Sequence, residues 1–288
     1  MKGGGGPGDF RERLDRARTI ERSPAAAEPL DFLVVVLDYQ LGRSLQGSMR
    51  SAAARVSSGA LEARLTDRWP LLDLTAAAGP LSQEVSEAVR VLTGAPPVPG
   101  PLADSGRGLL AAGDGEVRSL VEAWLDDPTL LDPRMGGWVR IAAAPLLELA
   151  AAGIDPPSRD EWSGPVCPMC GGPPQCSVIV EESGAFLQGS PRYLICARCA
   201  ARWSFPRSVC VWCGEEDSRR LGPYAADGQD GVRIDACDTC RHYIKTFDLR
   251  VAGARQVVPL VDDIATLALD VWAHEQGMSR PALSLAGV

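Results

Sequence analysis

Four short cysteine motifs in the second half of this 288-residue chain constrain its fold more than any other feature. The pairs are Cys167/Cys170, Cys196/Cys199, Cys210/Cys213 and Cys237/Cys240, and the ninth cysteine, Cys176, stands apart. Two intervening residues let one tight turn direct both sulfurs to the same ion, and two such turns supply the four ligands of a tetrahedral site. The spacing therefore predicts two metal sites, each made of four cysteines.

An internal repeat indicates which pairs belong together. The sequence Cys167-Pro-Met-Cys-Gly recurs 43 residues later as Cys210-Val-Trp-Cys-Gly, and residues 192–199 are echoed 41 residues later. We interpret the repeat as two consecutive ribbon-like units, each closing one site. The first site is Cys167, Cys170, Cys196 and Cys199, and the second is Cys210, Cys213, Cys237 and Cys240. A cross-braced arrangement, with the first pair joined to the third, also agrees with the spacing.

The residues around the motifs suggest how the turns are built. Gly171 and Gly214 directly follow the second cysteine of their pairs, where a positive φ is often required. Alternating or apolar stretches predict strands at 177–180, 192–195 and 232–234. Each ribbon should therefore consist of short strands joined by cysteine-bearing turns.

Other cysteine chemistries fit less well. The N-terminus has no apolar core and no cleavage site of a signal peptide, so we expect a cytoplasmic chain with reduced thiols. A thioredoxin-like pair needs a βαβ frame, and four regular motifs favour mononuclear sites over an iron–sulfur cluster. Either zinc or iron suits such a site, so two ions per chain are expected and their identity stays open.

We expect Cys176 to be a free thiol, with a reactive thiol as the alternative, and neither His242 nor His274 to be a ligand.

The first half of the chain is predicted to be helical. Residues 9–153 contain no cysteine or histidine, and Leu30, Leu33 and Leu37 recur at helical spacing. Six or seven helices fit, with a loop at 93–101 and an interruption at Pro145. A polar linker occupies 154–165. One final helix is expected from Val257 to Trp272, with Asp262, Asp263 and Asp270 on the side opposite its apolar face.

The predicted fold class is α+β. It consists of an all-helical domain (1–160, with 1–8 disordered), rubredoxin-like or zinc-ribbon four-cysteine modules (161–205 and 206–256), and a C-terminal helix and tail (257–288). A net charge of −8, with 11 acids against 11 bases in 161–256, argues against a nucleic-acid binder. The longest strongly apolar run, 32–37, is too short to span a bilayer. No catalytic constellation is evident, and closed four-sulfur sites leave no open position, so we expect no enzyme.

The second half also resembles a known family. The segment Cys167-Pro-Met-Cys-Gly-Gly-Pro-Pro, residues 192–199 with Trp203, the segment Cys237-Asp-Thr-Cys-Arg-His-Tyr-Ile-Lys, and Asp262-Asp-Ile-Ala near the end carry the resemblance. These residues are similar to the formate dehydrogenase accessory proteins of the FdhE family. The resemblance covers about 161–275, whereas the first half of the chain resembles the family mainly in its helical character. Departures are the extra Cys176 and the shortened segment after Gly277.

The resemblance implies an accessory protein, not a catalyst. Such a protein acts in the cytoplasm on a molybdenum- or tungsten-dependent formate dehydrogenase and contacts its catalytic subunit. The eight paired cysteines would be its rubredoxin-like metal ligands, and no catalytic acid or base carries over. The alternatives are a zinc-ribbon adaptor for nucleic acid or protein, and a rubredoxin-type electron-transfer protein.

Overall fold

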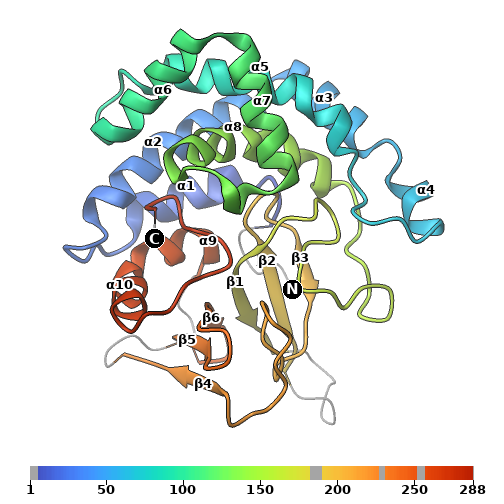
Figure 1. The fold of residues 1–288 in the computed structure, drawn as a ribbon, viewed down its shortest axis with the longest axis vertical. Coiled ribbons are helices and arrows are strands. Elements are labelled where there is room, and N and C mark those ends of the chain that lie inside the picture. The colour runs from blue at the N-terminus through green and yellow to red at the C-terminus, as the bar shows by residue number, and fades with distance from the viewer. Residues whose placement is uncertain (1–5, 182–189, 227–230, 252–256, 288) are drawn as a thin grey trace.

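The computed structural model describes residues 6–181, 190–226, 231–251 and 257–287. Its N-terminal half is helical, as Figure 1 shows. The helices are α1 (Phe10–Thr19), α2 (Ala27–Ser44), α3 (Gly47–Ser57), α4 (Ala60–Leu65), α5 (Leu74–Leu92), α6 (Gly100–Ala112), α7 (Asp114–Asp126) and α8 (Pro133–Ala152), with a 3-10 turn at Pro128–Leu130. These described helices outnumber the six or seven expected, and the predicted loop at 93–101 separates α5 from α6.

Helix α8 forms the centre of the helical layer. It packs against α2, α3 and α5, and the side chains of Trp138, Ile141 and Leu146 are fully buried there. The expected interruption at Pro145 does not occur, because α8 continues through it to Ala152. The ring of Pro145 is buried among the neighbouring helices, so packing stabilises a helix that local propensity disfavours.

The second half forms one mixed sheet. Its strands are β1 (Pro174–Ile179), β2 (Arg192–Cys196), β3 (Arg202–Ser204), β4 (Leu221–Tyr224), β5 (Val232–Cys237) and β6 (Tyr243–Asp248), in the order β3-β2-β1-β6-β5-β4. Within each repeat unit the strands are antiparallel, and β1 pairs with β6 in parallel. The two predicted ribbons are therefore joined edge to edge. The sequence pattern predicted β1, β2 and β5 but not the other three strands.

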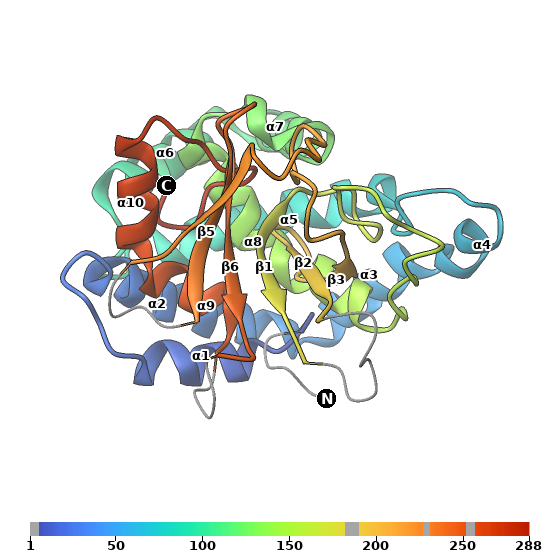
Figure 2. The same cartoon turned by 90° about the horizontal axis from the view of Figure 1, so that it is seen from below.

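The chain ends in two short helices instead of one. They are α9 (Pro259–Ala265) and α10 (Leu267–Glu275), separated at Thr266. Helix α9 joins the apolar cluster of α1 and α2 through Val258, Val261 and Ile264, whereas Leu269 and Ala273 of α10 belong to the cluster on the sheet. Figure 2 shows both helices beside β5 and β6. The C-terminal segment thus connects the helical layer to the sheet.

The acids of this segment are buried, contrary to the expectation that they lie on the side away from the core. Asp263 and Asp270 are at most 1% exposed, and both contact Lys245 of β6, at 2.8 and 2.6 Å. Arg280 binds the same two carboxylates, at 3.1 and 2.9 Å. Asp262 is also buried and pairs with Arg16 of α1 at 2.6 Å. A sequence pattern does not reveal such partners, because they come from distant elements.

The predicted α+β class is confirmed: a helical region precedes a six-stranded sheet region, and helices end the chain. Of residues 1–8, for which we expected disorder, 1–5 lie outside the described residues, and the backbone N–H of Gly8 donates to Glu148 at 2.8 Å. In the described ranges, no helix combines the length and apolar character needed to cross a membrane.

Candidate metal centres

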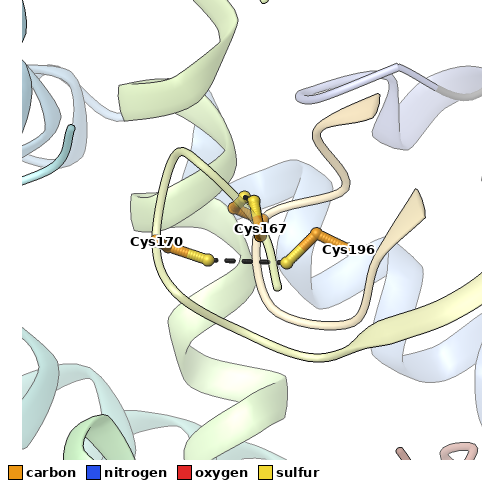
Figure 3. Close-up of side chains that lie close together, drawn as sticks. Cys167, Cys170 and Cys196 are labelled. Carbon is orange, nitrogen blue, oxygen red and sulfur yellow. Dashed lines mark hydrogen bonds between the residues drawn. The ribbon is translucent and has the colours of Figure 1, made fainter. Parts of the chain in front are cut away.

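The first four-cysteine cluster lies where two turns meet beneath the helical layer. Cys167 and Cys170 come from the turn before β1, and Cys196 and Cys199 come from the turn between β2 and β3. The sulfurs of Cys170 and Cys196 are 3.4 Å apart (Figure 3). Those of Cys167 and Cys199 are 3.6 Å apart. All four side chains are buried. The structure thus brings together the four residues that the sequential pairing predicted.

The second cluster repeats this arrangement in the other half of the sheet. Cys210 and Cys213 precede β4, Cys237 ends β5, and Cys240 lies between β5 and β6. The Cys210–Cys240 and Cys213–Cys237 sulfur distances are 3.7 and 3.8 Å. The cross-braced alternative would join the first motif to the third, which the structure keeps in different clusters.

The sulfur positions fit a tetrahedral metal ion. At a metal–sulfur distance of about 2.3 Å, the edges of an S₄ tetrahedron are about 3.8 Å long. Each cluster approaches this length along two edges, and within a cluster all ligand atoms lie within 4.8 Å of one another. The donor set of four sulfurs is typical of zinc or iron sites.

The four turns share one backbone geometry. In each, the first cysteine donates its N–H to the carbonyl five residues on, and its own carbonyl accepts from the residue after the second cysteine. That residue has a positive φ in all four turns: Gly171 at 68°, Ala200 at 54°, Gly214 at 75° and Arg241 at 59°. The prediction for the two glycines is confirmed. Ala200 and Arg241 show that the turn imposes this conformation even on residues that disfavour it.

Backbone amides within the turns donate to sulfur. The N–H of Arg198 donates to Cys196 Sγ at 3.3 Å, and the N–H of Trp212 donates to Cys210 Sγ at 3.4 Å. These bonds stabilise negative charge on the sulfurs, which metal binding requires.

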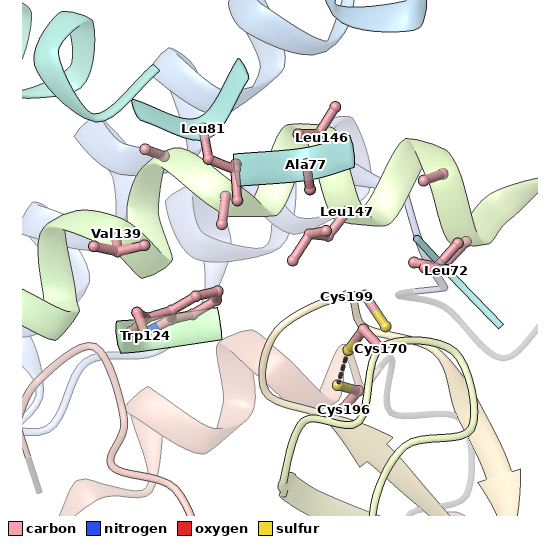
Figure 4. Packing of buried hydrophobic residues seen from close by; sticks show 14 of the residues in the cluster. Leu72, Ala77, Leu81, Trp124, Val139, Leu146, Leu147, Cys170, Cys196 and Cys199 are labelled. Carbon is pink, nitrogen blue, oxygen red and sulfur yellow. Dashed lines mark hydrogen bonds between the residues drawn. The ribbon is translucent and has the colours of Figure 1, made fainter. Parts of the chain in front are cut away.

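The helical domain holds the first cluster in place. The N–H groups of Leu71 and Leu72 donate to the carbonyls of Pro168 and Met169, both at 2.9 Å. Leu72 and Leu147 lie directly above Cys170 and Cys199 in Figure 4. Because backbone and side-chain contacts both seal it, this cluster has no direct access to solvent.

The second cluster reaches the surface. Cys213 is exposed and Cys240 is partly exposed, although Cys210 and Cys237 are buried. The indole of Trp212 stacks on the His242 imidazole with the ring centres 4.3 Å apart and the planes at 7°. Trp212 is itself 47% exposed, so the cluster and this aromatic pair form one accessible surface.

Burial and mutual hydrogen bonding shift the thiol pKa values in opposite directions. Burial raises the pKa of Cys199 well above its usual value, and its cysteine neighbours add to the effect. At Cys196 burial also opposes ionisation, but hydrogen bonds involving Cys167, Cys170 and Cys199 outweigh it and lower the pKa. Cys237 of the second cluster shows the same balance, with backbone amides of its turn contributing. One sulfur of each cluster, that of Cys196 or Cys237, therefore favours the thiolate form that metal binding requires.

The remaining candidates lie outside the clusters. Cys176 is fully buried on the face of β1 toward α10, and burial raises its pKa, which disfavours the thiolate form. His242 hydrogen-bonds through Nδ1 to the carbonyl of Cys240 at 2.9 Å and belongs to neither sulfur cluster. His274 is exposed in the last turn of α10.

Comparison with known proteins agrees with this geometry. The family description "FdhE, central domain" matches residues 166–207, which carry the first cluster. The description "FdhE, C-terminal domain" matches residues 209–286, which carry the second. Both matches fall in the second half of the chain, which is therefore similar to FdhE proteins.

Individual members of the FdhE family extend the comparison. The "Protein FdhE homolog" of Aquifex aeolicus is 34% identical over 129 residues, which are 45% of this chain and 44% of that protein. The homolog of Pseudomonas aeruginosa is 34% identical over 169 residues, 55% of this chain and 51% of the relative. The matched stretches thus span about half the length of these relatives.

A solved structure shares the fold along most of the chain. The crystal structure of the FdhE protein from Pseudomonas aeruginosa covers 96% of this chain and 93% of its own, with a TM-score of 0.66 and 22% identity. The likeness in fold therefore extends over the helical half, which the matched family descriptions do not cover.

Proposed function

We propose that this chain is a cytoplasmic accessory protein for the maturation of a molybdenum- or tungsten-dependent formate dehydrogenase. It would bind the catalytic subunit of that enzyme and would not itself be an enzyme. Its eight paired cysteines would hold two zinc or iron ions. Similarity of the second half to FdhE proteins supports the class of function, and the difference in exposure between the clusters supports a different role for each cluster.

The observation that carries the proposal is that one four-cysteine cluster is sealed while its repeat reaches the surface. Cys170 and Cys199 of the first cluster are fully buried, whereas Cys213 of the second is exposed. A bound ion would staple the turns of each cluster, and if that ion is iron it could also change oxidation state. The first cluster would fix the sheet to the helices, and the second would present Trp212 and its neighbours to the client.

The test is co-purification with the formate dehydrogenase catalytic subunit. We expect the metal-loaded chain to retain the subunit, and Cys213→Ser to lose the second ion together with the client. Cys176→Ala is the matched control, because it removes a cysteine outside both clusters. Retention of the client by a Cys213→Ser chain that lacks the second ion would contradict the proposal.

Exposure of the second cluster also favours one rival function, rubredoxin-type electron transfer. Electron transfer requires an ion that changes oxidation state, whereas a structural staple works equally well with zinc. Zinc-loaded protein that fully restores formate dehydrogenase activity would eliminate the rival. Activity restored by the iron-loaded form alone would favour it.

We also propose that the domains end near residues 160, 205 and 256. The pairing of β1 with β6 joins the two ribbons in one sheet. Limited proteolysis should then cut the chain near these three positions, with the two ribbons still associated after cleavage near 205, and resistance of these positions to cleavage would argue against this division.

A further inference from the structure

A cavity of about 260 Å³ lies on the face of the sheet opposite α9 and α10. Its floor includes Arg192 of β2 and Arg233 of β5, and Arg207 contributes from the segment that connects the two units. Cys210 and Cys237 of the second cluster line one side. Three guanidinium-bearing side chains thus surround one small space next to the exposed metal centre.

The internal repeat explains why two of these arginines share a face. Arg192 and Arg233 occupy equivalent positions, each four residues before the first cysteine of its turn. Since side chains alternate along a strand, each arginine projects to the same side as that cysteine. The parallel pairing of β1 with β6 places both units in one sheet, so both arginines line one cavity.

Arg192 lacks a full set of partners. It is only 4% exposed, and its Nε has no hydrogen-bond partner among the residues that the structure describes. Its guanidinium lies 5.9 Å from the centre of the Phe205 ring. A buried guanidinium with an unsatisfied donor is costly unless an anion or acceptor reaches it.

The one carboxylate that lines the cavity among the described residues is already engaged. Asp235 accepts from Arg233 Nε at 2.7 Å through one oxygen and from Thr246 Oγ1 at 2.6 Å through the other. Burial lowers the pKa of Arg192, and the like charges of Arg233 and Arg207 lower it further, although Asp235 and Cys210 oppose them. The charge of Arg192 is therefore not neutralised by a close ion pair with any described carboxylate.

We propose that this cavity binds a phosphate group, with Arg192 and Arg207 as its principal donors. Guanidinium groups match the oxygens of an oxyanion through parallel N–H bonds. Ser208 and Ser218 also line the cavity, and donors from several directions suit a tetrahedral anion better than a flat carboxylate. The volume accommodates inorganic phosphate or the end of a small phosphate ester.

A rival explanation is that the arginines only balance the negative charge of a metal-loaded four-sulfur cluster. Cys210 lines the same cavity, and its negative charge favours ionised Arg192. In that case Arg192 variants would change the affinity for metal and no phosphate would bind. The two explanations therefore predict different outcomes in a single set of measurements.

The experiment is calorimetric titration of the full-length, metal-loaded chain with inorganic phosphate at constant ionic strength. We expect saturable binding that Arg192→Gln and Arg207→Gln each weaken by about tenfold or more. Arg219→Gln is the matched control, because that arginine is exposed, pairs with Asp217 and does not line the cavity. Its phosphate affinity should equal that of the parent chain.

A second titration with glycerol 3-phosphate distinguishes the sources of the group. Binding as tight as that of inorganic phosphate supports an ester ligand, and binding of inorganic phosphate alone supports the free ion. Absence of saturable binding overturns the proposal, and so does phosphate binding by Arg192→Gln and Arg207→Gln that is as tight as binding by the parent chain. If Arg192→Gln does not fold, Arg207→Gln decides, because its side chain lies at the surface.

Discussion

The guanidinium of Arg198 lies 4.7 Å from the ring centre of Trp124 and donates to the carbonyl of the same residue at 2.7 Å. A second bond reaches the carbonyl of Leu125 at 3.2 Å. Arg198 stands between the two cysteines of the Cys196 turn, and Trp124 lies in the last turn of α7. One side chain thus connects the first cluster to a helix terminus, where a cation is favourable.

Replacing Arg198 with alanine should loosen this connection. We expect the free energy of unfolding to fall by about 2–3 kcal/mol, because charge-assisted hydrogen bonds and a stacked cation are lost from a buried site. Denaturant unfolding of the metal-loaded chain measures the change. Arg219→Ala is the control, since exposed ion pairs contribute little. A loss no larger than that of the control would show that Arg198 does not connect the layers.

The buried charges beneath α9 and α10 should be intolerant of single substitutions. Asp270→Asn would leave Lys245 and Arg280 sharing one carboxylate, and the loss of one partner from a buried ion network costs about 3–5 kcal/mol. Chemical denaturation should register the loss, and Asp217→Asn at the surface should change stability little. An effect below about 1 kcal/mol at Asp270 would indicate that solvent reaches the network.

Acid should destabilise the protein through Asp263. Burial raises the pKa of this carboxyl, but the charges of Arg280 and Lys245 outweigh burial and lower the pKa to about 2. The unfolded value is about 3.9, so its contribution is complete above that pH and is lost as the pH falls toward 2. Asp263→Asn should flatten the dependence of unfolding free energy on pH between about 4 and 2. An unchanged slope would rule out this assignment.

Metal removal should proceed in two steps. An excess of chelator should take the ion of the second cluster first, because Cys213 is exposed while the first cluster is sealed beneath Leu72 and Leu147. When the release of metal is monitored with a metal-sensitive dye, it should show two phases of equal amplitude. Cys213→Ser should abolish the fast phase and leave the slow one. A single phase for both ions would mean that exposure does not control release.

Much of the candidate site could be predicted from the sequence because its signal is local. The two-residue spacing of Cys167/Cys170 and its three repeats predicts turns and sets of four sulfurs, and the internal repeat favours the sequential grouping that the structure shows. Periodic leucines likewise indicated the helices, and alternation indicated β1, β2 and β5. These features depend on neighbours a few residues away, which a single sequence displays directly.

The remaining features depend on contacts between distant segments. The sequence by itself determined two pairs of cysteine-bearing turns, a helical half and a resemblance to FdhE proteins, since each is encoded by spacing or composition over a short stretch. Only the tertiary structure decided that β1 pairs with β6, that Asp263 and Asp270 are buried against Lys245, and that one cluster is sealed while the other is exposed. The physical reason is that burial and ion pairing are set by which surfaces meet when the chain folds, and residue spacing does not specify those surfaces.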